Sequence, residues 1–262
     1  MNTEKVTEHI VNWLKEYAQK ANVKGFVVGI SGGIDSAVTS TLCAKTGLQT
    51  LCVEMPIHQS ENQVSRAKEH IKQLKSTFIN VGSEHVDLTS SFENFKMVVP
   101  KTKHSTKVDL PLANTRARLR MTTLYYFAGL ENLLVAGTGN KVEDFGVGFY
   151  TKYGDGGVDL SPIADLLKSE VYELAAHLNV PKSIQNAQPT DGLFGDSRTD
   201  EDQLGASYDE LEWAMTMQNT GKKEVDFSGR ELEVFTIYLH LNKNNQHKML
   251  PIPICKIPKK LQ

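Results

Sequence analysis

Cysteine is scarce in this sequence, with three residues among 262, and no two of them have the CxxC spacing of a zinc knuckle or a thioredoxin-like redox site. Cys43 and Cys52 lie in apolar segments, which predicts buried, reduced thiols. No apolar run is long enough to span a bilayer, so no membrane partner is expected. The amphipathic, acid-containing start of the chain is unlike a secretory signal peptide, so we expect a cytoplasmic location.

An excess of either charge is also missing, because the formal net charge is only -2. A protein that binds nucleic acid mainly by electrostatics is usually strongly basic, so no nucleic-acid partner is expected. With 40% hydrophobic and 23% charged residues, the composition is that of a soluble globular protein. Neither an internal repeat nor a linker divides the chain, which favours one domain over residues 1–262 with helical additions near the C-terminus.

Strand and helix patterns alternate in the first third of the chain. Short apolar runs rich in β-branched residues predict buried strands, and apolar residues at helical spacing predict helices between them. The expected elements are a helix at 3–20, a strand at 25–30, a helix at 37–45, a strand at 49–55, a helix at 61–74 and a strand at 77–81. This rhythm predicts an α/β fold with an open parallel sheet.

The rest of the chain continues less regularly. Residues 82–113 have weak periodicity and predict a helical excursion with a mobile loop, and residues 137–157 hold seven of the nineteen glycines, which predicts a loop. Residues 189–202 are polar and acidic and predict an exposed loop. Further elements are expected at 114–128 (helix), 132–137 (strand), 165–178 (helix with Asp165 as N-cap), 208–217 (helix) and 230–241 (helix), before a basic tail from His247.

A glycine-rich loop, Gly29 to Ser36, lies between the first predicted strand and the next helix. Backbone N–H groups at a helix N-terminus form a site for phosphate, and glycines let the anion approach closely. An acid such as Asp35 would repel phosphates unless it holds Mg²⁺. The alternative is a plain tight turn that opens a helix. The loop is not a Walker A motif, which requires a lysine after its last glycine.

The sequence SGGIDS at residues 31–36 resembles the pyrophosphate loop, SGGxDS, of the ATP pyrophosphatase superfamily. That superfamily includes NAD, GMP and asparagine synthetases and several tRNA-modifying enzymes. The resemblance implies an open parallel sheet flanked by helices on both faces, as in adenine nucleotide alpha hydrolases. It also implies cleavage of ATP between its α and β phosphates, transfer of AMP to a second substrate, and release of pyrophosphate.

The middle of the chain resembles the NAD synthetase family within this superfamily. The segments that carry the resemblance are NTRARLRM at 114–121, LVAGTGNKVE at 134–143, GFYTKYGDGGVD at 148–159, PIADLLK at 162–168, PTD at 189–191, TDEDQLG at 199–205, YDE at 208–210 and HK at 247–248. They span about residues 24–248. Fewer than 25 residues precede the first predicted strand, too few for a glutaminase domain, so the resemblance implies the ammonia-dependent form. That form converts nicotinic acid adenine dinucleotide (deamido-NAD), ATP and ammonia to NAD⁺, AMP and pyrophosphate, the last step of NAD biosynthesis, in a homodimer.

The family match also implies roles for individual residues. Asp35 and Glu143 would bind Mg²⁺, and Lys168 would stabilise phosphate charge during transfer. The residues implied to bind ATP are Gly29, Ile30, Ser31, Gly32, Gly33, Ile34, Asp35, Ser36, Thr138, Lys168 and Thr190. The residues implied to bind deamido-NAD are Arg118, Lys152, Asp159, His247 and Lys248. Asp155 is a candidate catalytic residue that orients ammonia, and the alternative for it is a simple Asp-Gly turn.

Some positions depart from the family pattern. Glu54 and Met55 follow the second strand where some relatives have a basic residue, and His58 is a candidate substitute. The span from Glu143 to Gly148 is one residue longer than in some relatives. Arg116, Arg118 and Arg120 cannot all face one way on a helix, so at least one should be solvated. Two alternative functions remain open: a tRNA-modifying ATP pyrophosphatase, and a nucleotide-binding module without catalysis.

Overall fold

The structure is a computed structural model that describes residues 1–100, 108–190 and 199–261. Its centre is a parallel sheet of four strands in the order β3-β2-β1-β4. The strands are β1 (Gly25–Gly29), β2 (Gln49–Glu54), β3 (Val81–His85) and β4 (Leu133–Val135). In the register of the sheet, Gly25 of β1 lies beside Gln49 of β2 and Leu133 of β4. The predicted parallel sheet is confirmed.

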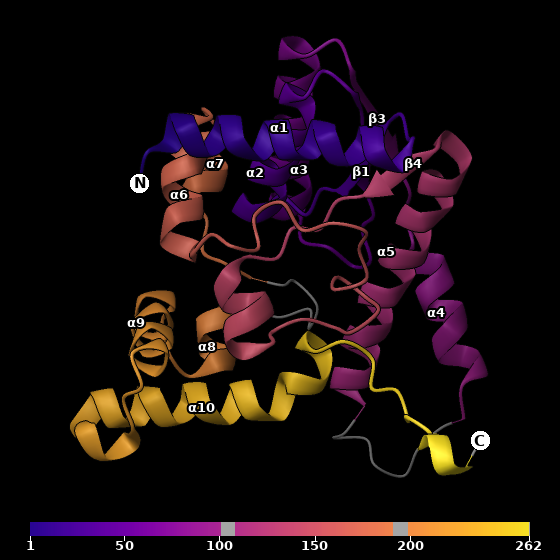
Figure 1. Ribbon diagram of the computed structural model, residues 1–262. Helices are drawn as coiled ribbons and strands as arrows, with labels where there is room; N and C mark the ends of the chain where they lie inside the picture. Colours follow the sequence, from indigo (N-terminus) through magenta and orange to yellow (C-terminus); the bar gives the residue numbers. More distant parts are fainter. Residues whose placement is uncertain (101–107, 191–198, 262) are drawn as a thin grey trace.

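Helices cover both faces of this sheet (Figure 1). The helices of the N-terminal half are α1 (Thr3–Ala21), α2 (Ile34–Lys45), α3 (Glu61–Thr77), α4 (Thr89–Val98) and α5 (Asp109–Glu131). Phe26 and Val28 of β1 pack in one core cluster with α1, α2, α3 and α6 (Lys168–His177), whereas Val27 packs in another with α4 and α5. Successive strand residues point to opposite faces, so the continuous apolar run of β1 reflects burial on both sides.

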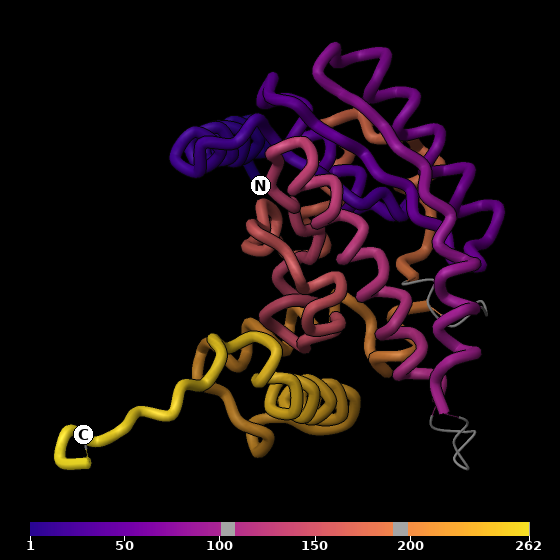
Figure 2. The backbone as a smooth tube through the Cα atoms, turned by 90° about the vertical axis from the view of Figure 1, so that its right-hand side faces the viewer, coloured from indigo at the N-terminus to yellow at the C-terminus, as the bar shows by residue number. Residues whose placement is uncertain are grey.

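The C-terminal part adds a third cluster away from the sheet. Its elements are the π-helix η2 (Val142–Val147), α6 (Lys168–His177), α7 (Lys182–Gln185), α8 (Asp200–Leu204), α9 (Tyr208–Asn219), the short 3₁₀-helices η3 (Glu224–Asp226) and η4 (Lys259–Leu261), and α10 (Gly229–Met249). Side chains of η2, α9 and α10 form the cluster. Residues after α10 extend away from the body (Figure 2). The expected C-terminal helical additions are confirmed.

Several expected boundaries are wrong. The third strand covers 81–85 rather than 77–81, because α3 continues to Thr77 and the Ile79 side chain is fully exposed in the connecting turn. Asp165 is not an N-cap, because α6 begins at Lys168, and Asp165 pairs instead with Lys141 at 2.8 Å. The glycine-rich span contains the π-helix, and α10 extends to Met249, so His247 lies in a helix.

Other expectations fall partly on residues that the structure does not describe. The helical excursion expected within 82–113 is α4, whereas residues 101–107 of the expected mobile loop lie outside the described residues. Residues 191–198 of the expected exposed loop also lie outside them. Cys43 and Cys52 are buried, as predicted, and burial raises the pKa of the Cys52 thiol to about 12. Among the described helices, none combines the length and apolar character that crossing a bilayer requires.

Candidate active site

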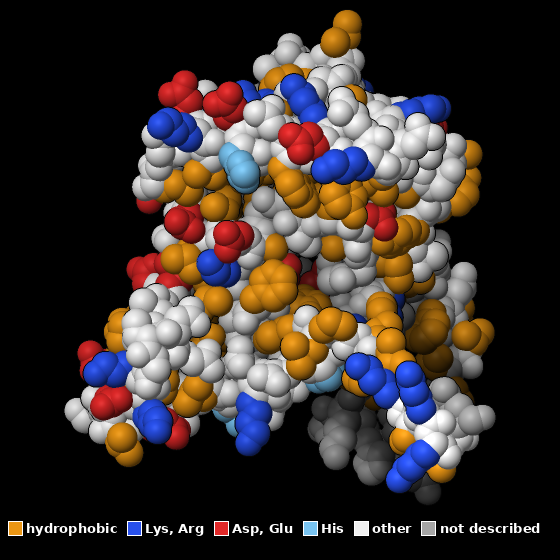
Figure 3. Space-filling view, in the orientation of Figure 1, with side chains coloured by type: hydrophobic (Ala, Val, Ile, Leu, Met, Phe, Trp, Pro, Cys, Tyr) orange, Lys and Arg blue, Asp and Glu red, His pale blue; other side chains and the backbone are white. Residues whose placement is uncertain are grey.

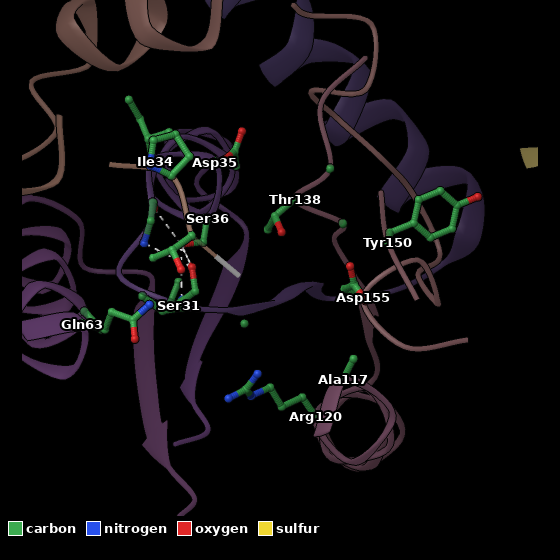
Figure 4. Close-up of a pocket in the computed structure, with 18 of the residues that line it drawn as sticks. Ser31, Ile34, Asp35, Ser36, Gln63, Ala117, Arg120, Thr138, Tyr150 and Asp155 are labelled. Carbon is green, nitrogen blue, oxygen red and sulfur yellow. Dashed lines mark hydrogen bonds between the residues drawn. The ribbon is translucent and has the colours of Figure 1, made fainter. Parts of the chain in front are cut away.

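A cavity of about 270 Å³ lies at the carboxyl ends of β1 and β4 (Figure 4). The chain leaves β1 toward β2 on one side, while β4 pairs on the other side. In open α/β sheets, ligands bind in the crevice where the strand order switches in this way. The predicted residues Thr138, Lys168 and Thr190 all line the cavity.

The glycine-rich loop forms one wall of this cavity. Of the predicted loop residues, Gly29, Ile30, Ser31, Gly33, Ile34, Asp35 and Ser36 line it. Gly32 does not, and its role is conformational: its φ is +81°, and a Cβ there would lie 2.4 Å from the carbonyl oxygen of Gln63 on α3. Only glycine avoids both the strain and the overlap.

Hydroxyl groups hold the loop in shape. Ser36 Oγ donates to the Gly33 carbonyl at 3.0 Å and lies 3.1 Å from Ser31 Oγ, which accepts from the Gly33 N–H at 3.1 Å. The N-cap residue of α2, Gly33, makes no side-chain capping hydrogen bond. The N-terminal amides of α2 therefore face the cavity side without a capping side chain, which suits an anion such as phosphate.

Three charged side chains meet beside the loop. Lys168 Nζ lies 2.7 Å from Asp35 Oδ2 and 3.0 Å from Glu143 Oε1. The lysine side chain is only 3% exposed. Burial alone would lower the pKa of Lys168, but the nearby charges of Asp35 and Glu143 and the hydrogen bonds to them raise it well above its usual range. The structure thus brings together the two carboxylates that the sequence singles out, with the predicted phosphate-binding lysine between them.

The donor set is compatible with Mg²⁺. Among residues 1–100, 108–190 and 199–261, no group of three or more His, Cys, Asp or Glu side chains is arranged to hold a metal. Mg²⁺ commonly uses only one or two carboxylates, with waters and substrate phosphates as its other ligands. Asp35 and Glu143 on the wall of a phosphate-binding cavity match that pattern. Asn140 helps to fix the pair, since its amide donates to Asp35 Oδ1 at 3.1 Å.

Two more acids border this site. Asp155, the predicted ammonia-orienting residue, lines the main cavity and an adjoining cavity of about 130 Å³, and its Oδ1 accepts from the Thr151 N–H at 3.0 Å. Asp144, which the sequence reasoning missed, lines both cavities too. Burial, followed by the charges of Glu143, Asp155 and Asp35, raises the pKa of Asp144 to about 8. Burial also raises the pKa of Asp155. Asp144 is therefore suited to exchanging a proton near neutral pH.

The predicted deamido-NAD residues lie elsewhere. None of Arg118, Lys152, Asp159, His247 and Lys248 is among the described residues that line the main cavity. Arg118 donates to the Lys152 carbonyl at 3.3 Å, and Lys152 Nζ contacts the His247 carbonyl, so these three form a group on the surface. Lys248 Nζ donates to the Gly148 and Tyr150 carbonyls at 2.7 and 2.8 Å.

Asp159 has a structural role in this conformation. Its Oδ1 accepts from Tyr125 at 3.0 Å, and its Oδ2 accepts from the Val135 N–H at 2.8 Å. The carboxylate thereby ties the glycine-rich segment to α5 and β4.

The three arginines of α5 point in different directions. Arg116 lies 4.3 Å from the centre of the Phe92 ring, and Arg118 is exposed. Arg120 extends into the main cavity (Figure 4), where it donates to the Met55 carbonyl at 3.0 Å and to Gln59 at 2.8 Å. Arg120 is not among the site residues expected from the sequence. The sequence does contain a signal that Arg120 faces inward, because Arg120 follows the buried Ala113 and Ala117 at helical spacing.

His58 does not supply the basic group that the sequence suggested for this region. Its Nε2 lies 2.8 Å from Glu93 of α4, and it is not among the residues lining the cavity. Its backbone turns away from the strand direction, with φ of 51°. Arg120 instead places a guanidinium next to Met55.

Comparison with known proteins agrees with this geometry. The family model for NAD synthase matches residues 6–251. The NH(3)-dependent NAD(+) synthetase of Carboxydothermus hydrogenoformans is 38% identical over 254 residues, covering 95% of this chain and 96% of the relative. The corresponding protein of Mesoplasma florum is 38% identical, covering 95% of both chains.

Solved structures show the same fold. The NMN synthetase of Francisella tularensis has a TM-score of 0.82 and 31% identity, covering 99% of both chains. The NH3-dependent NAD synthetase of Campylobacter jejuni, solved with nitrate, has a TM-score of 0.77 and 26% identity, covering 98% of this chain and 100% of its own. From the match over 6–251 and these near full-length relatives, the chain belongs to the NAD synthase family.

Proposed function

We propose that this chain is an ammonia-dependent NAD synthetase, which uses ATP to convert the carboxylate of deamido-NAD to the amide of NAD⁺. Relatives that match this chain over nearly their whole length are named NH(3)-dependent NAD(+) synthetases. The observation that supports it in the structure is the meeting of Asp35, Glu143 and Lys168 beside the glycine-rich loop. A non-catalytic nucleotide-binding module would not require these three groups together.

The chemistry begins with activation of a poor electrophile. An oxygen of the nicotinate carboxylate attacks the α-phosphorus of ATP, the bond to the β-phosphate oxygen breaks, and pyrophosphate leaves. The loop amides at the start of α2 hold the phosphates, and Lys168 balances their negative charge. Asp35 and Glu143 would hold Mg²⁺, which neutralises phosphate charge when bound. Thr138 and Thr190, which line the cavity, would contact ATP.

Amide formation completes the reaction. Ammonia attacks the carbonyl carbon of the adenylate, the carbon–oxygen bond to AMP breaks, and the nitrogen loses one proton. We assign Asp155 to orient ammonia and accept that proton, since its raised pKa makes the carboxylate a better base than an ordinary aspartate. The remainder of deamido-NAD contacts Arg118, Lys152, Asp159, His247 and Lys248.

A homodimer would complete the deamido-NAD site. Arg118, Lys152 and His247 lie on the surface rather than inside the main cavity. In one subunit they would therefore bind deamido-NAD only on an open surface. Exposed apolar side chains are also present toward the C-terminal end of α5, including Tyr126 at 64% and Leu130 at 62% exposure. On the face shown in Figure 3, hydrophobic side chains gather below α1 and around a central hollow. Sedimentation of active enzyme as a monomer would contradict the dimer.

The deciding assay measures AMP release from ATP with deamido-NAD and ammonium, at a cytoplasmic pH. AMP formation that requires both substrates, with NAD⁺ as product, supports the proposal. AMP formation only with tRNA, or none with any substrate, would refute it. The metal assignment has its own test: Asp35→Ala should abolish Mg²⁺-dependent turnover while far-ultraviolet circular dichroism stays unchanged, and near-full activity would refute the role of Asp35.

A second candidate substrate is the mononucleotide acid, nicotinic acid mononucleotide. It is favoured by the higher structural similarity to the Francisella tularensis NMN synthetase than to the Campylobacter jejuni NAD synthetase. The activated carboxylate is the same in both substrates, and only the adenylyl half differs. Comparison of kcat/KM for the two acids decides between them. A ratio above about tenfold in either direction corresponds to roughly 1.4 kcal/mol of differential transition-state binding.

A further inference from the structure

Tyr208 connects two acids that border the candidate active site. It is the first residue of α9, and its side chain is buried in the C-terminal cluster. The phenolic hydroxyl lies 2.6 Å from Glu143 Oε1 and 3.3 Å from Asp200 Oδ2. Lys168 Nζ lies 4.7 Å from the centre of the Tyr208 ring. One aromatic side chain thus touches the lysine, the proposed metal ligand and a third carboxylate.

The short bond to Glu143 restricts that carboxylate. A phenol has one proton to donate, and the 2.6 Å contact is the stronger of the two, so the hydroxyl donates to Glu143. Lys168 donates to the same oxygen, Oε1, at 3.0 Å. Two donors on one oxygen limit the directions in which the carboxylate can point. They come from α6 and α9, which pack together in the C-terminal half.

Asp200 extends the connection to the segment that carries Thr190. The Asp200 N–H donates to the Pro189 carbonyl at 3.1 Å, and Pro189 and Thr190 line the cavity. Asp200 itself lines the cavity and is buried. The position of Tyr208 is also fixed locally, because its N–H donates to Glu201 Oε1 at 3.0 Å. Tyr208 therefore lies between Glu143 and the segment that Asp200 joins to Pro189.

We propose that Tyr208 is a positioning residue that orients the Glu143 carboxylate for the divalent cation. This inference rests on the metal site in the proposed function. Groups that hydrogen-bond to a metal ligand typically change metal affinity by roughly 10–100-fold when they are removed. Tyr208→Phe removes the hydroxyl and keeps the buried ring, so it isolates this contribution.

Tyr238→Phe is the matched control. Tyr238 is a buried tyrosine of the same cluster, and its hydroxyl donates to Gln218 at 3.0 Å. It is not among the residues that line the cavity. A general loss of packing or of a buried hydrogen bond should affect both variants equally, whereas a change in metal affinity should be specific to Tyr208→Phe.

The experiment is a titration with Mn²⁺ in the presence of α,β-methylene-ATP, in which electron paramagnetic resonance detects the bound ion. The temperature is chosen from thermal unfolding curves so that all variants are folded. Tyr208→Phe should bind Mn²⁺ about tenfold more weakly than the wild type or worse, and Tyr238→Phe should match the wild type. In steady-state assays, Tyr208→Phe should need more Mg²⁺ for half-maximal rate without a matching rise in KM for deamido-NAD. Mn²⁺ affinity within twofold of the wild type, or an equal loss in Tyr238→Phe, would overturn the inference.

A double variant tests whether Tyr208 acts through Glu143. In a Glu143→Gln background, Tyr208→Phe should weaken Mn²⁺ binding by less than twofold further, whereas a full additional tenfold loss would show an independent effect and overturn the coupling. Failure of the proposed function can be distinguished from failure of this inference. In that case the wild type itself forms no AMP with deamido-NAD and ammonium, whereas failure of this inference leaves wild-type activity intact and Tyr208→Phe indistinguishable from the wild type.

Discussion

Lys168 and Asp35 lie 133 residues apart in the sequence, and their side chains meet at 2.7 Å in the interior of the site. The contact joins the first turn of α6 to the first turn of α2. Glu143 closes the group from the π-helix. Three elements from different parts of the chain thus depend on one buried ammonium group, and its removal has consequences for stability as well as for catalysis.

Lys168→Met is expected to destabilise the nucleotide-free protein by about 3–5 kcal/mol, since it leaves two mostly buried carboxylates without their cation. Urea unfolding measures this change. Lys141→Met is the control, because Lys141 pairs with Asp165, whose side chain is 96% exposed. An exposed pair contributes at most about 1 kcal/mol. Equal losses in the two variants would contradict the structural role of Lys168.

Gly32→Ala is expected to destabilise the fold more than Gly47→Ala. Both glycines have positive φ, +81° and +76°, so both substitutions carry backbone strain of about 1 kcal/mol. Only at position 32 would the new Cβ lie 2.4 Å from the Gln63 carbonyl, whereas no atom lies within 4 Å at position 47. We expect a difference of about 1–2 kcal/mol in the free energy of unfolding, together with weaker ATP binding in Gly32→Ala. Equal destabilisation would mean that the overlap is relieved without cost.

Asp144→Asn is expected to stabilise the metal-free protein at alkaline pH. The pKa of Asp144 is raised to about 8 in the folded state, against 3.8 as its ordinary value, chiefly by burial. Between about pH 4 and pH 8 the folded state therefore binds a proton that the unfolded state has released, and the stability of the wild type falls as pH rises. The variant lacks this penalty.

Urea unfolding at pH 5 and pH 8.5 checks this. Asp144→Asn should exceed the wild type by at least about 1 kcal/mol at pH 8.5, with a smaller difference at pH 5. Asp165→Asn, which replaces an exposed acid, should show no such pH-dependent difference. A constant difference across pH would mean that Asp144 is ionised throughout.

His70→Leu is expected to flatten the acid limb of the stability curve. His70 is fully buried in α3, and burial lowers its pKa from 6.5 to about 4. As pH falls through this interval the unfolded state binds a proton first, so the wild type loses up to roughly 1.4 kcal/mol per pH unit from this group. The slope of unfolding free energy between pH 4 and 6.5 should be smaller in His70→Leu. The exposed His177→Leu should keep the wild-type slope, and an unchanged slope in His70→Leu would contradict the prediction.

Local sequence patterns were sufficient to predict most helices and strands in the first half of the chain. The apolar run of β1 and the SGGIDS turn after it predict a buried strand and a phosphate loop, because both depend on neighbours in the sequence. The strand expected at 77–81 was wrong, since an exposed Ile79 in a turn cannot be told from a strand residue by its apolar side chain alone. Where an apolar residue ends up depends on packing that the sequence does not display.

Part of the cavity lining was predictable from the sequence, but its arrangement was not. Asp35 and Glu143 were expected together from the family motifs, and they meet. The contribution of Tyr208 and Asp200 could not be inferred, since it arises from contacts between α8, α9 and the π-helix. The choice between Arg118 and Arg120 depends on the rotation of α5, which the buried alanines fix. The assignments of deamido-NAD contacts remain predictions for the ligand-bound protein.

The π-helix at Val142–Val147 has a consequence for reading other members of this family. A π-turn holds one more residue than an α-turn, and such bulges occur inside helices at functional sites. We expect the wider turn to hold the extra residue that the sequence comparison predicts between Glu143 and Gly148, while the acid stays at the cavity wall and the Phe149 N–H reaches the Glu143 carbonyl at 2.9 Å. In a shorter relative, counting forward from Glu143 would misplace the counterparts of residues 144–147, so side chains there should be matched by their place in space.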